Sequence, residues 1–232
     1  MYRAQLVLGA LLAFVCSEPL AAAQQSLPVL DFDALRVIGA LTVEVKKGHA
    51  TALSVIGDPH DLDSVAADVA DRTLIIGMKP GRWGSEAKTH GPILLRITVP
   101  RLRSAEVVGA GTLNTEALQG VDVTIIMNGP GSINATQVRA DHLEIIESGP
   151  GKLVASGTAA QLNVQVNGFG SADLTQLSAK DIKIGTIGGP AIQASATRSA
   201  LINANGSGTI SVTGHPACTV HNEGEGIATC GG

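Results

Sequence analysis

NGPGSINATQVRADHLEIIESGPG, residues 128–151, contains the triplet Gly-Pro-Gly twice, with the copies twenty residues apart. Similar glycine pairs recur through the second half of the chain at spacings of 18 to 20 residues, and in the fifth copy Pro190 replaces the second glycine. Internal repeats of this length indicate a solenoid in which each repeat is one coil. The glycines that we place at the corners of the coils are Gly109, Gly111, Gly129, Gly131, Gly149, Gly151, Gly168, Gly170, Gly206 and Gly208.

Apolar residues fall into the same positions of every coil when the repeats are aligned on the first glycine. The position four residues before it is occupied by Ile125, Ile145, Val164, Ile184, Ile202 and Val220. The neighbouring position, five before the glycine, is polar in five of six copies. This alternation predicts strands with one buried face, and columns kept through six copies favour parallel stacking about 4.8 Å apart. We therefore predict an all-β parallel solenoid with coils of 18–20 residues, about 29 Å long in its repeats.

A phosphate-binding function for the glycine pairs is not supported. None of the pairs has the third glycine of a dinucleotide fingerprint, and none is followed by Gly-Lys-Ser/Thr. Asn precedes the glycine in three of the coils, and both residue types tolerate the positive φ of a sharp corner. The glycine pairs are therefore interpreted as structural corners.

The first 23 residues have the features of a secretory signal peptide. Arg3 supplies the positive start, residues 6–15 the apolar stretch, and residues 21–23 (Ala-Ala-Ala) a small-residue cleavage site. Cys16 raises the alternative of a lipid-anchored cysteine, but the residues before it are larger than that processing prefers. After cleavage the net charge stays at −4, which gives no indication of nucleic-acid binding. We expect a protein without a membrane span, secreted or in the periplasm or cell envelope.

Residues 24–104 are predicted to be β-strands with less regular spacing than the repeats of 105–232. The range 35–45 alternates as one strand, 64–78 as two strands around a turn at 70–72, and 92–99 as another. These strands form either the first, irregular coils of the solenoid or a small β cap domain. The polar loop at 80–91 contains Arg82 and Trp83, which either contact a partner or fold over one end of the solenoid.

Aromatic residues are scarce, with Phe32, Trp83 and Phe169 alone outside the predicted signal peptide. The core must therefore consist of Ile, Val, Leu and Ala. Sugar-binding grooves and buried active sites are usually lined by aromatic rings, which this chain can hardly supply. The repeats also lack a Gly-x-Ser-x-Gly motif and an outward cluster of acidic or basic residues. We predict no catalytic, cofactor-binding or metal-binding residues.

Cys218 and Cys230 both fall in apolar columns, so we expect their side chains to face the interior of the last coil. In an oxidising compartment two such thiols form a disulfide, and free buried thiols are the alternative. A zinc site with His215 and His221 is a third possibility, opposed by the outward position of His221. The acidic stretch 57–63 lacks the glycine and distal glutamate of a calcium loop and is interpreted as a turn.

The chain resembles the head GIN domain family, described as putative auto-transporter adhesins. The resemblance rests on FDALRVIGALTVEV, DRTLIIGM, ITVPRLRSAEVVGAGTLN and the closing GSGTISVTGHPACTV with GEG, and it covers residues 32–226. It implies a right-handed parallel β-helix in an extracytoplasmic location, mostly in Gram-negative bacteria. The family has no established activity, so the resemblance transfers no catalytic residues.

Three functions compete at this point. The first is a non-enzymatic scaffold or adhesin-like module that binds an unknown cell-surface, glycan or protein partner. The second is an extracellular polysaccharide-processing enzyme on the same fold, which the scarcity of aromatic rings and of outward carboxylates disfavours. The third is a self-assembling subunit, in line with a possible homo-oligomer, which the expected Cys218–Cys230 closure of the last coil disfavours.

Overall fold

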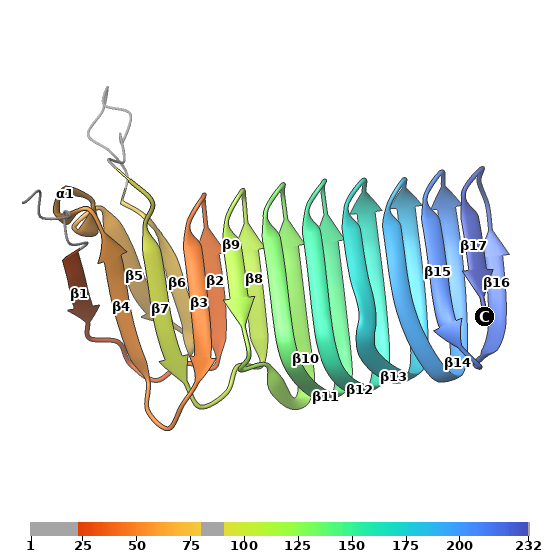
Figure 1. The fold of residues 1–232 in the computed structure, drawn as a ribbon, viewed down its shortest axis with the longest axis horizontal. Helices are drawn as coiled ribbons and strands as arrows, with labels where there is room; N and C mark the ends of the chain where they lie inside the picture. The colour runs from red at the N-terminus through yellow and green to blue at the C-terminus, as the bar shows by residue number, and fades with distance from the viewer. Residues whose placement is uncertain (1–22, 80–90, 232) are drawn as a thin grey trace, which may run out of the picture.

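The computed structural model describes residues 23–79 and 91–231, which fold into a β-solenoid (Figure 1). All described strands belong to one hydrogen-bonded sheet that winds into two facing layers. The predicted signal peptide, residues 1–23, lies outside the described residues except for its last position. The loop residues Arg82 and Trp83 also lie outside them.

The repeat region consists of coils that run from one glycine corner, across the solenoid and back to the next corner (Figure 1). Each long strand pairs in parallel with its equivalent in the next coil, as in the pairs β10–β11 and β12–β13, so the predicted parallel stacking is confirmed. The strands are β8 (Ser104–Val108), β9 (Thr112–Thr115), β10 (Gln119–Asn128), β11 (Ser132–Ser148), β12 (Lys152–Gly168), β13 (Ser171–Gly188), β14 (Ala191–Gly206), β15 (Thr209–Gly214), β16 (Ala217–Asn222) and β17 (Ile227–Cys230).

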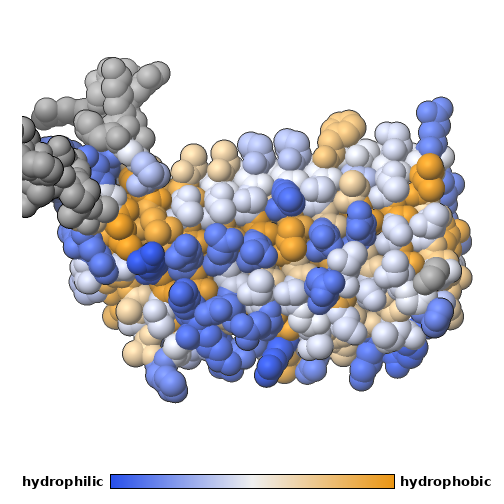
Figure 2. All heavy atoms as spheres, viewed as in Figure 1, coloured by the Kyte–Doolittle hydropathy of each residue, from blue (hydrophilic) through white to orange (hydrophobic). Residues whose placement is uncertain are grey.

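We call the two layers by their position relative to the corners. The pre-corner layer contains the strands that lead up to the glycines, namely β8, β10, the second halves of β11–β14, and β16. The post-corner layer contains the strands that follow the glycines, namely β9, the first halves of β11–β14, β15 and β17. The core lies between the two layers, and the face of the molecule seen in Figure 2 carries a mixture of hydrophilic and hydrophobic residues.

The buried columns follow the predicted register. Ile184 pairs with Val164 on one side and with Ile202 on the other, and all three side chains are fully buried. Stacking identical or similar aliphatic side chains in this way fills the core without aromatic rings. The apolar residues of the core are otherwise almost all Ile, Val, Leu and Ala, as the composition predicts.

The first glycine of six of the pairs has a positive φ, between 105° and 132°, at Gly109, Gly129, Gly149, Gly168, Gly188 and Gly206. This conformation strains residues that carry a Cβ, which explains the repetition of glycine at the corner. The opposite bends are less regular. They use a positive φ at Gln137 in one coil and at Gly157 in the next, beside a shift in strand register.

The alternating range 35–45 is two strands rather than the one that the sequence suggested. β2 (Ala34–Ile38) and β3 (Thr42–Lys47) are separated by a corner at Gly39, whose φ is 96°. β2 pairs in parallel with β8, and β3 with β9, so the two strands form a coil stacked on the repeats. The alternation continues through the corner because the buried side chains of both strands point into the same core.

The remaining N-terminal strands close this end of the solenoid. β6 (Thr73–Met78) pairs with β2 and β7 (Leu94–Val99) pairs with β3, so a later part of the chain lies outside the first coil. β5 (Val65–Ala70) forms the expected hairpin with β6, around the positive-φ residues Asp71 and Arg72. The outermost strands β4 (Ala52–Gly57) and β1 (Ala23–Leu27) run antiparallel.

A short helix, α1 (Pro59–Leu62), occupies the acidic stretch that we interpreted as a turn. The Asp58 side chain accepts a hydrogen bond from the backbone N–H of His60 at 2.9 Å, and Pro59 starts the helix. Asp and Pro are favoured at these two positions. Asp58 therefore serves as a helix cap in this structure.

Candidate functional site

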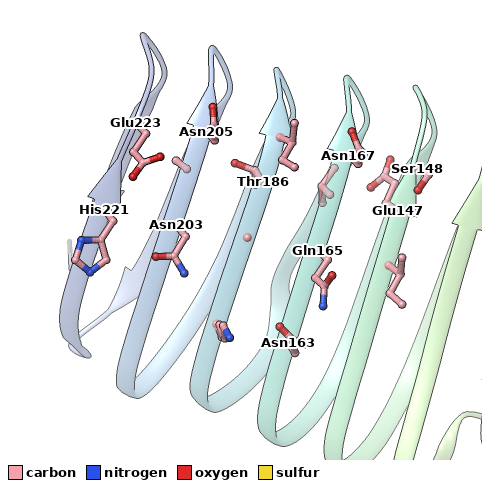
Figure 3. Close-up of a pocket in the computed structure, with 16 residues that line it drawn as sticks. Glu147, Ser148, Asn163, Gln165, Asn167, Thr186, Asn203, Asn205, His221 and Glu223 are labelled. Carbon is pink, nitrogen blue, oxygen red and sulfur yellow. The ribbon is translucent and has the colours of Figure 1, made fainter.

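A groove of about 780 Å³ lies on the outer surface of the pre-corner layer, in the C-terminal half of the solenoid. Its polar lining is dominated by side-chain amides, and we call it the amide groove (Figure 3). These amides alternate with buried residues along β12 and β14, so the period-two pattern turns all of them outward. The five amide residues are Asn163, Gln165, Asn167, Asn203 and Asn205.

The amide groove contains few charged side chains. Lys183 lies on β13, between the amide strands β12 and β14, and His221 and Glu223 lie on the last coil. His221 lines the groove because its side chain points outward, as the sequence predicts. Because the charges are few and of mixed sign, the middle of the groove offers hydrogen-bonding groups without a net charge.

A second hollow of about 660 Å³ continues the same surface and shares Asn163 and Lys183 with the amide groove. It contains Asp181, whose carboxylate accepts a hydrogen bond from Arg198 Nε at 2.7 Å and another from Ser199 Oγ at 2.6 Å. The hydrogen bonds from Arg198 and Ser199 lower the pKa of Asp181 to about 2. This carboxylate is therefore held in its charged form by its neighbours.

Glu147 is the described side chain with the most unusual environment. It precedes the corner of its coil by two residues, in a column that points into the core, and its side chain is fully buried beneath the groove. Neither carboxylate oxygen has a hydrogen-bond partner. Burial raises the pKa of Glu147 to about 7, although the nearby backbone N–H of Ser171 acts in the opposite direction.

The room for Glu147 comes from a glycine of the next coil. A Cβ at Gly170 would clash with the carboxylate of Glu147, just as a Cβ at Gly151 would clash with Met127 one coil earlier. The second glycine of the corner therefore leaves space for a long side chain from the preceding coil. This gives the second corner glycine a packing role in addition to the turn.

Sequence reasoning did not single out Glu147, although the alignment contained the signal. The position two before the corner glycine reads Met127, Glu147, Val166 and Thr186 in successive coils. A carboxyl group in a column of otherwise mostly apolar side chains is an exception that marks an unpaired buried charge. The columns at four and six residues before the glycine, which contain no acid, hid this exception.

Cys218 and Cys230 form a disulfide with an S–S distance of 2.06 Å, which joins β16 to β17 in the last coil. The expectation that both side chains lie in the interior is wrong for Cys218, which is exposed. The reason is that no further coil covers β16, all of whose residues are exposed. The bond consumes the two thiols that a zinc site would need.

Within residues 23–79 and 91–231 no group of three or more His, Cys, Asp and Glu side chains is arranged to hold a metal ion. Among the same residues no helix is long and apolar enough to cross a membrane. The candidate contact residues Arg82 and Trp83 fall in the stretch that the structure does not describe. The groove on the pre-corner layer is therefore the main candidate site in the described part of the chain.

Solved structures of bacterial proteins share this fold. A putative adhesin from Bacteroides fragilis superposes with a TM-score of 0.82 at 19% identity, covering 92% of this chain and 97% of that one. A putative lipid binding protein from Parabacteroides distasonis gives 0.73 at 20% identity, covering 90% and 96%. A putative adhesin from the same species gives 0.65 at 19% identity, with the same coverage. At these identities the likeness shows the fold alone.

Comparison with curated proteins gives no match. The family comparison does give one, because the model of the putative auto-transporter adhesin, head GIN domain, matches residues 31–216. This range runs from the segment before β2 to the start of the last coil, and so includes both the irregular N-terminal strands and the repeats. The chain belongs to the putative auto-transporter adhesin, head GIN domain family.

Proposed function

We propose that this protein is a non-enzymatic, adhesin-like binding module that is secreted to the cell envelope. Its ligand contacts the outer surface of the pre-corner layer. The observation that carries this proposal is the amide groove, a hollow of about 780 Å³ with uncharged hydrogen-bonding groups along its middle. Membership of a putative adhesin family supports the adhesin-like role. The predicted signal peptide supports export.

The rigidity of the solenoid supports binding through its surface. The coils are filled by fully buried aliphatic side chains such as Ile145 and Ile184. The outer side chains are therefore held at a repeat of about 4.8 Å by the stacked strands. A fixed surface of this kind orders few groups when it binds, which favours weak but repeated contacts with an extended partner.

The environments of Glu147 and Asp181 support binding over hydrolysis. A glycoside hydrolase requires two carboxyl groups on either side of the scissile bond, one of them with a raised pKa. Glu147 has a raised pKa and is among the residues that line the groove, but its side chain is fully buried, so its carboxyl group is not open to a ligand. Asp181, which does lie on the outer surface, is engaged by Arg198 and Ser199. Neither carboxyl group is placed to act as the acid of such a pair.

The proposal is tested with labelled protein lacking residues 1–23, applied to bacterial envelope fragments and host-cell surfaces. The groove variant replaces Asn163, Gln165 and Asn203 by alanine. The matched control replaces Asn134, Gln193 and Thr209 by alanine, all outward residues of the post-corner layer. We expect saturable binding that the groove variant loses and the control keeps.

Two results would contradict the proposed function. One is equal binding by the groove variant and the control, which would place the contact elsewhere. The other is release of soluble fragments from a polysaccharide incubated with the protein, which would favour a polysaccharide-processing enzyme as the function. Both assays use the same preparations. Circular dichroism of these preparations shows beforehand whether a variant has a folding defect.

A further inference from the structure

Gly185 leaves a notch in the floor of the amide groove. It occupies the position three before the corner, which in the coils on either side holds Gln165 and Asn203. A Cβ at Gly185 would meet no atom within 4 Å, and its φ is not positive. Neither the backbone nor the packing therefore requires glycine here. The absent side chain leaves a space between Gln165 and Asn203, the two amides that Figure 3 labels in this row.

The amides around the notch are available to a ligand. The structure gives none of the five a hydrogen bond to another side chain or to the backbone within its described residues. Each primary amide has two N–H donors and an acceptor oxygen. Hydroxyl groups also donate and accept, so a surface of amides matches a ligand that is rich in hydroxyls and carries no charge.

Exposed apolar side chains border the same region. Ile187 lines the groove and is 61% exposed, and Phe169 at the neighbouring corner is 75% exposed. The Phe169 ring lies over Gly189, where an added Cβ would come within about 3.0 Å of a ring carbon. The ring therefore rests against the next corner with one side open. A single exposed ring at this corner is enough to offer an apolar contact to a sugar.

We infer that the amide groove binds a neutral, extended polysaccharide that lies along the solenoid axis. This inference rests on the proposed binding function and specifies its ligand. The row Gln165, Gly185, Asn203 and His221 crosses four coils, which is about 14 Å at the strand spacing. One unit of the polymer enters the notch, while the amides bond the hydroxyls of its neighbours and the Ile187 and Phe169 side chains cover apolar faces.

Other polymers fit the groove less well. An acidic polysaccharide or a nucleic acid requires a concentration of positive charge, whereas the groove contains both Lys183 and Glu223 and the chain has a net charge of −4. A lipid chain requires an apolar lining, whereas the amides would be left without hydrogen bonds. These ligands are therefore the alternatives that the experiment must distinguish.

The test fills the notch. Gly185→Tyr adds a large side chain where the structure has open space, so the thermal midpoint should stay close to that of the unchanged protein. The matched control is Gln193→Tyr, at an exposed, outward position on β14 in the post-corner layer. Binding is measured by titration calorimetry and on arrays of neutral glucans, mannans and β-linked acetylated amino sugars, beside polygalacturonate and vesicles of phospholipid.

The expected result is binding to one neutral polymer, weakened at least tenfold by Gly185→Tyr and unchanged by Gln193→Tyr. If the tyrosine prevents folding, the pair Gln165→Ala and Asn203→Ala replaces it and should weaken binding about tenfold through lost hydrogen bonds. Binding of polygalacturonate or vesicles instead of neutral polymers would overturn the inference. So would neutral-polymer binding that neither groove variant changes.

The outcome separates this inference from the proposed function. Suppose that the unchanged protein retains envelope fragments, that Gly185→Tyr does not, and that no polysaccharide is bound. The proposed binding function would then stand. The ligand class alone would then be wrong, and a protein partner would take its place. Absence of binding to envelopes, cells and polymers alike would remove the proposed function itself.

Discussion

The irregular N-terminal coils and the regular repeats shift the pKa of a partly or fully buried carboxyl group in opposite directions. Asp33, just before β2, accepts hydrogen bonds from Arg103 Nε at 2.8 Å and Arg72 Nε at 3.1 Å. Burial acts to raise the pKa of Asp33, but the two arginines outweigh it and the pKa is lowered. Glu147 in the repeats has no such partner, and burial raises its pKa to about 7.

The difference follows from how each region is assembled. Asp33, Arg72 and Arg103 come from three separate segments that meet at the N-terminal end, so partners of opposite charge can be brought together. In the repeats, an inward side chain stacks on the equivalent residues of the neighbouring coils, and these are its potential partners. For Glu147 these are Met127 and Val166, which cannot pair with a charge. Regular stacking therefore makes the repeats intolerant of charge.

The largest expected effect comes from placing a charge in a fully buried column of the repeats. Ile184→Asp would leave an unpaired carboxylate between Val164 and Ile202, and we expect a loss of about 3–5 kcal/mol in the free energy of unfolding. The control is Lys183→Asp, one residue earlier and exposed, which should be nearly neutral. Urea denaturation measures both, and equal midpoints would contradict the observed register.

The repeats were predictable from sequence because their physics is local and repeated. The glycine at a corner such as Gly129 and the aliphatic column around Ile184 both recur every coil, so each copy supports the others. At Gly39 the same pattern was misread as one strand, because alternation alone does not show where a coil turns. The position of β6 and β7 outside β2 and β3 depends on contacts between distant segments, for which the sequence has no repeated signal.

The second expected effect concerns Glu147 and the pH. Because its folded pKa of about 7 exceeds the ordinary value of 4.5, its contribution to stability is fully present below pH 4.5 and is lost as the pH rises through 7. The free energy of unfolding should fall by about 3 kcal/mol over this range. Glu147→Met, which copies Met127 in the same column, should remove this fall and stabilise the protein at pH 8.

The control for this change is Glu144→Met, three residues earlier on the outer surface, which should retain the fall with pH. Denaturation curves at pH 4.5, 6, 7 and 8 make the comparison. A stability that is independent of pH between 4.5 and 8 in the unchanged protein would show that Glu147 finds a partner in solution. The contrast with Asp33 would then be lost.

The third expected effect is at the C-terminal end, where a disulfide joins the two strands of the last coil. Chain-entropy arguments give about 2–3 kcal/mol for a disulfide that spans twelve residues, as Cys218–Cys230 does. Replacing both cysteines by serine should destabilise β16 and β17 first, because they have a neighbour on one side only. Hydrogen exchange would show early loss of protection there, and unchanged protection would mean that the backbone pairing suffices.

The groove was less predictable than the fold. The outward alternation of residues such as Asn163 and Gln165 can be read from the columns. Their convergence in a hollow depends on the size of side chains in neighbouring coils, and above all on the missing side chain of Gly185. A glycine away from the corners was the available signal, and it was hidden among the more numerous corner glycines.

The smallest expected effect concerns Asp33 in the N-terminal coils. Arg103→Ala removes one partner of Asp33, and because the guanidinium is largely exposed we expect a loss of about 1 kcal/mol or less at pH 7. The pairing stabilises the fold above the ordinary pKa of 3.8 and is lost as the pH falls through the lowered pKa of Asp33, so the variant and the parent should converge in acid. Arg101→Ala, an exposed neighbour, is the control. A difference that persists in acid would mean that Arg103 acts through packing of its methylene groups, and the N-terminal coils would then resemble the repeats in relying on apolar contacts.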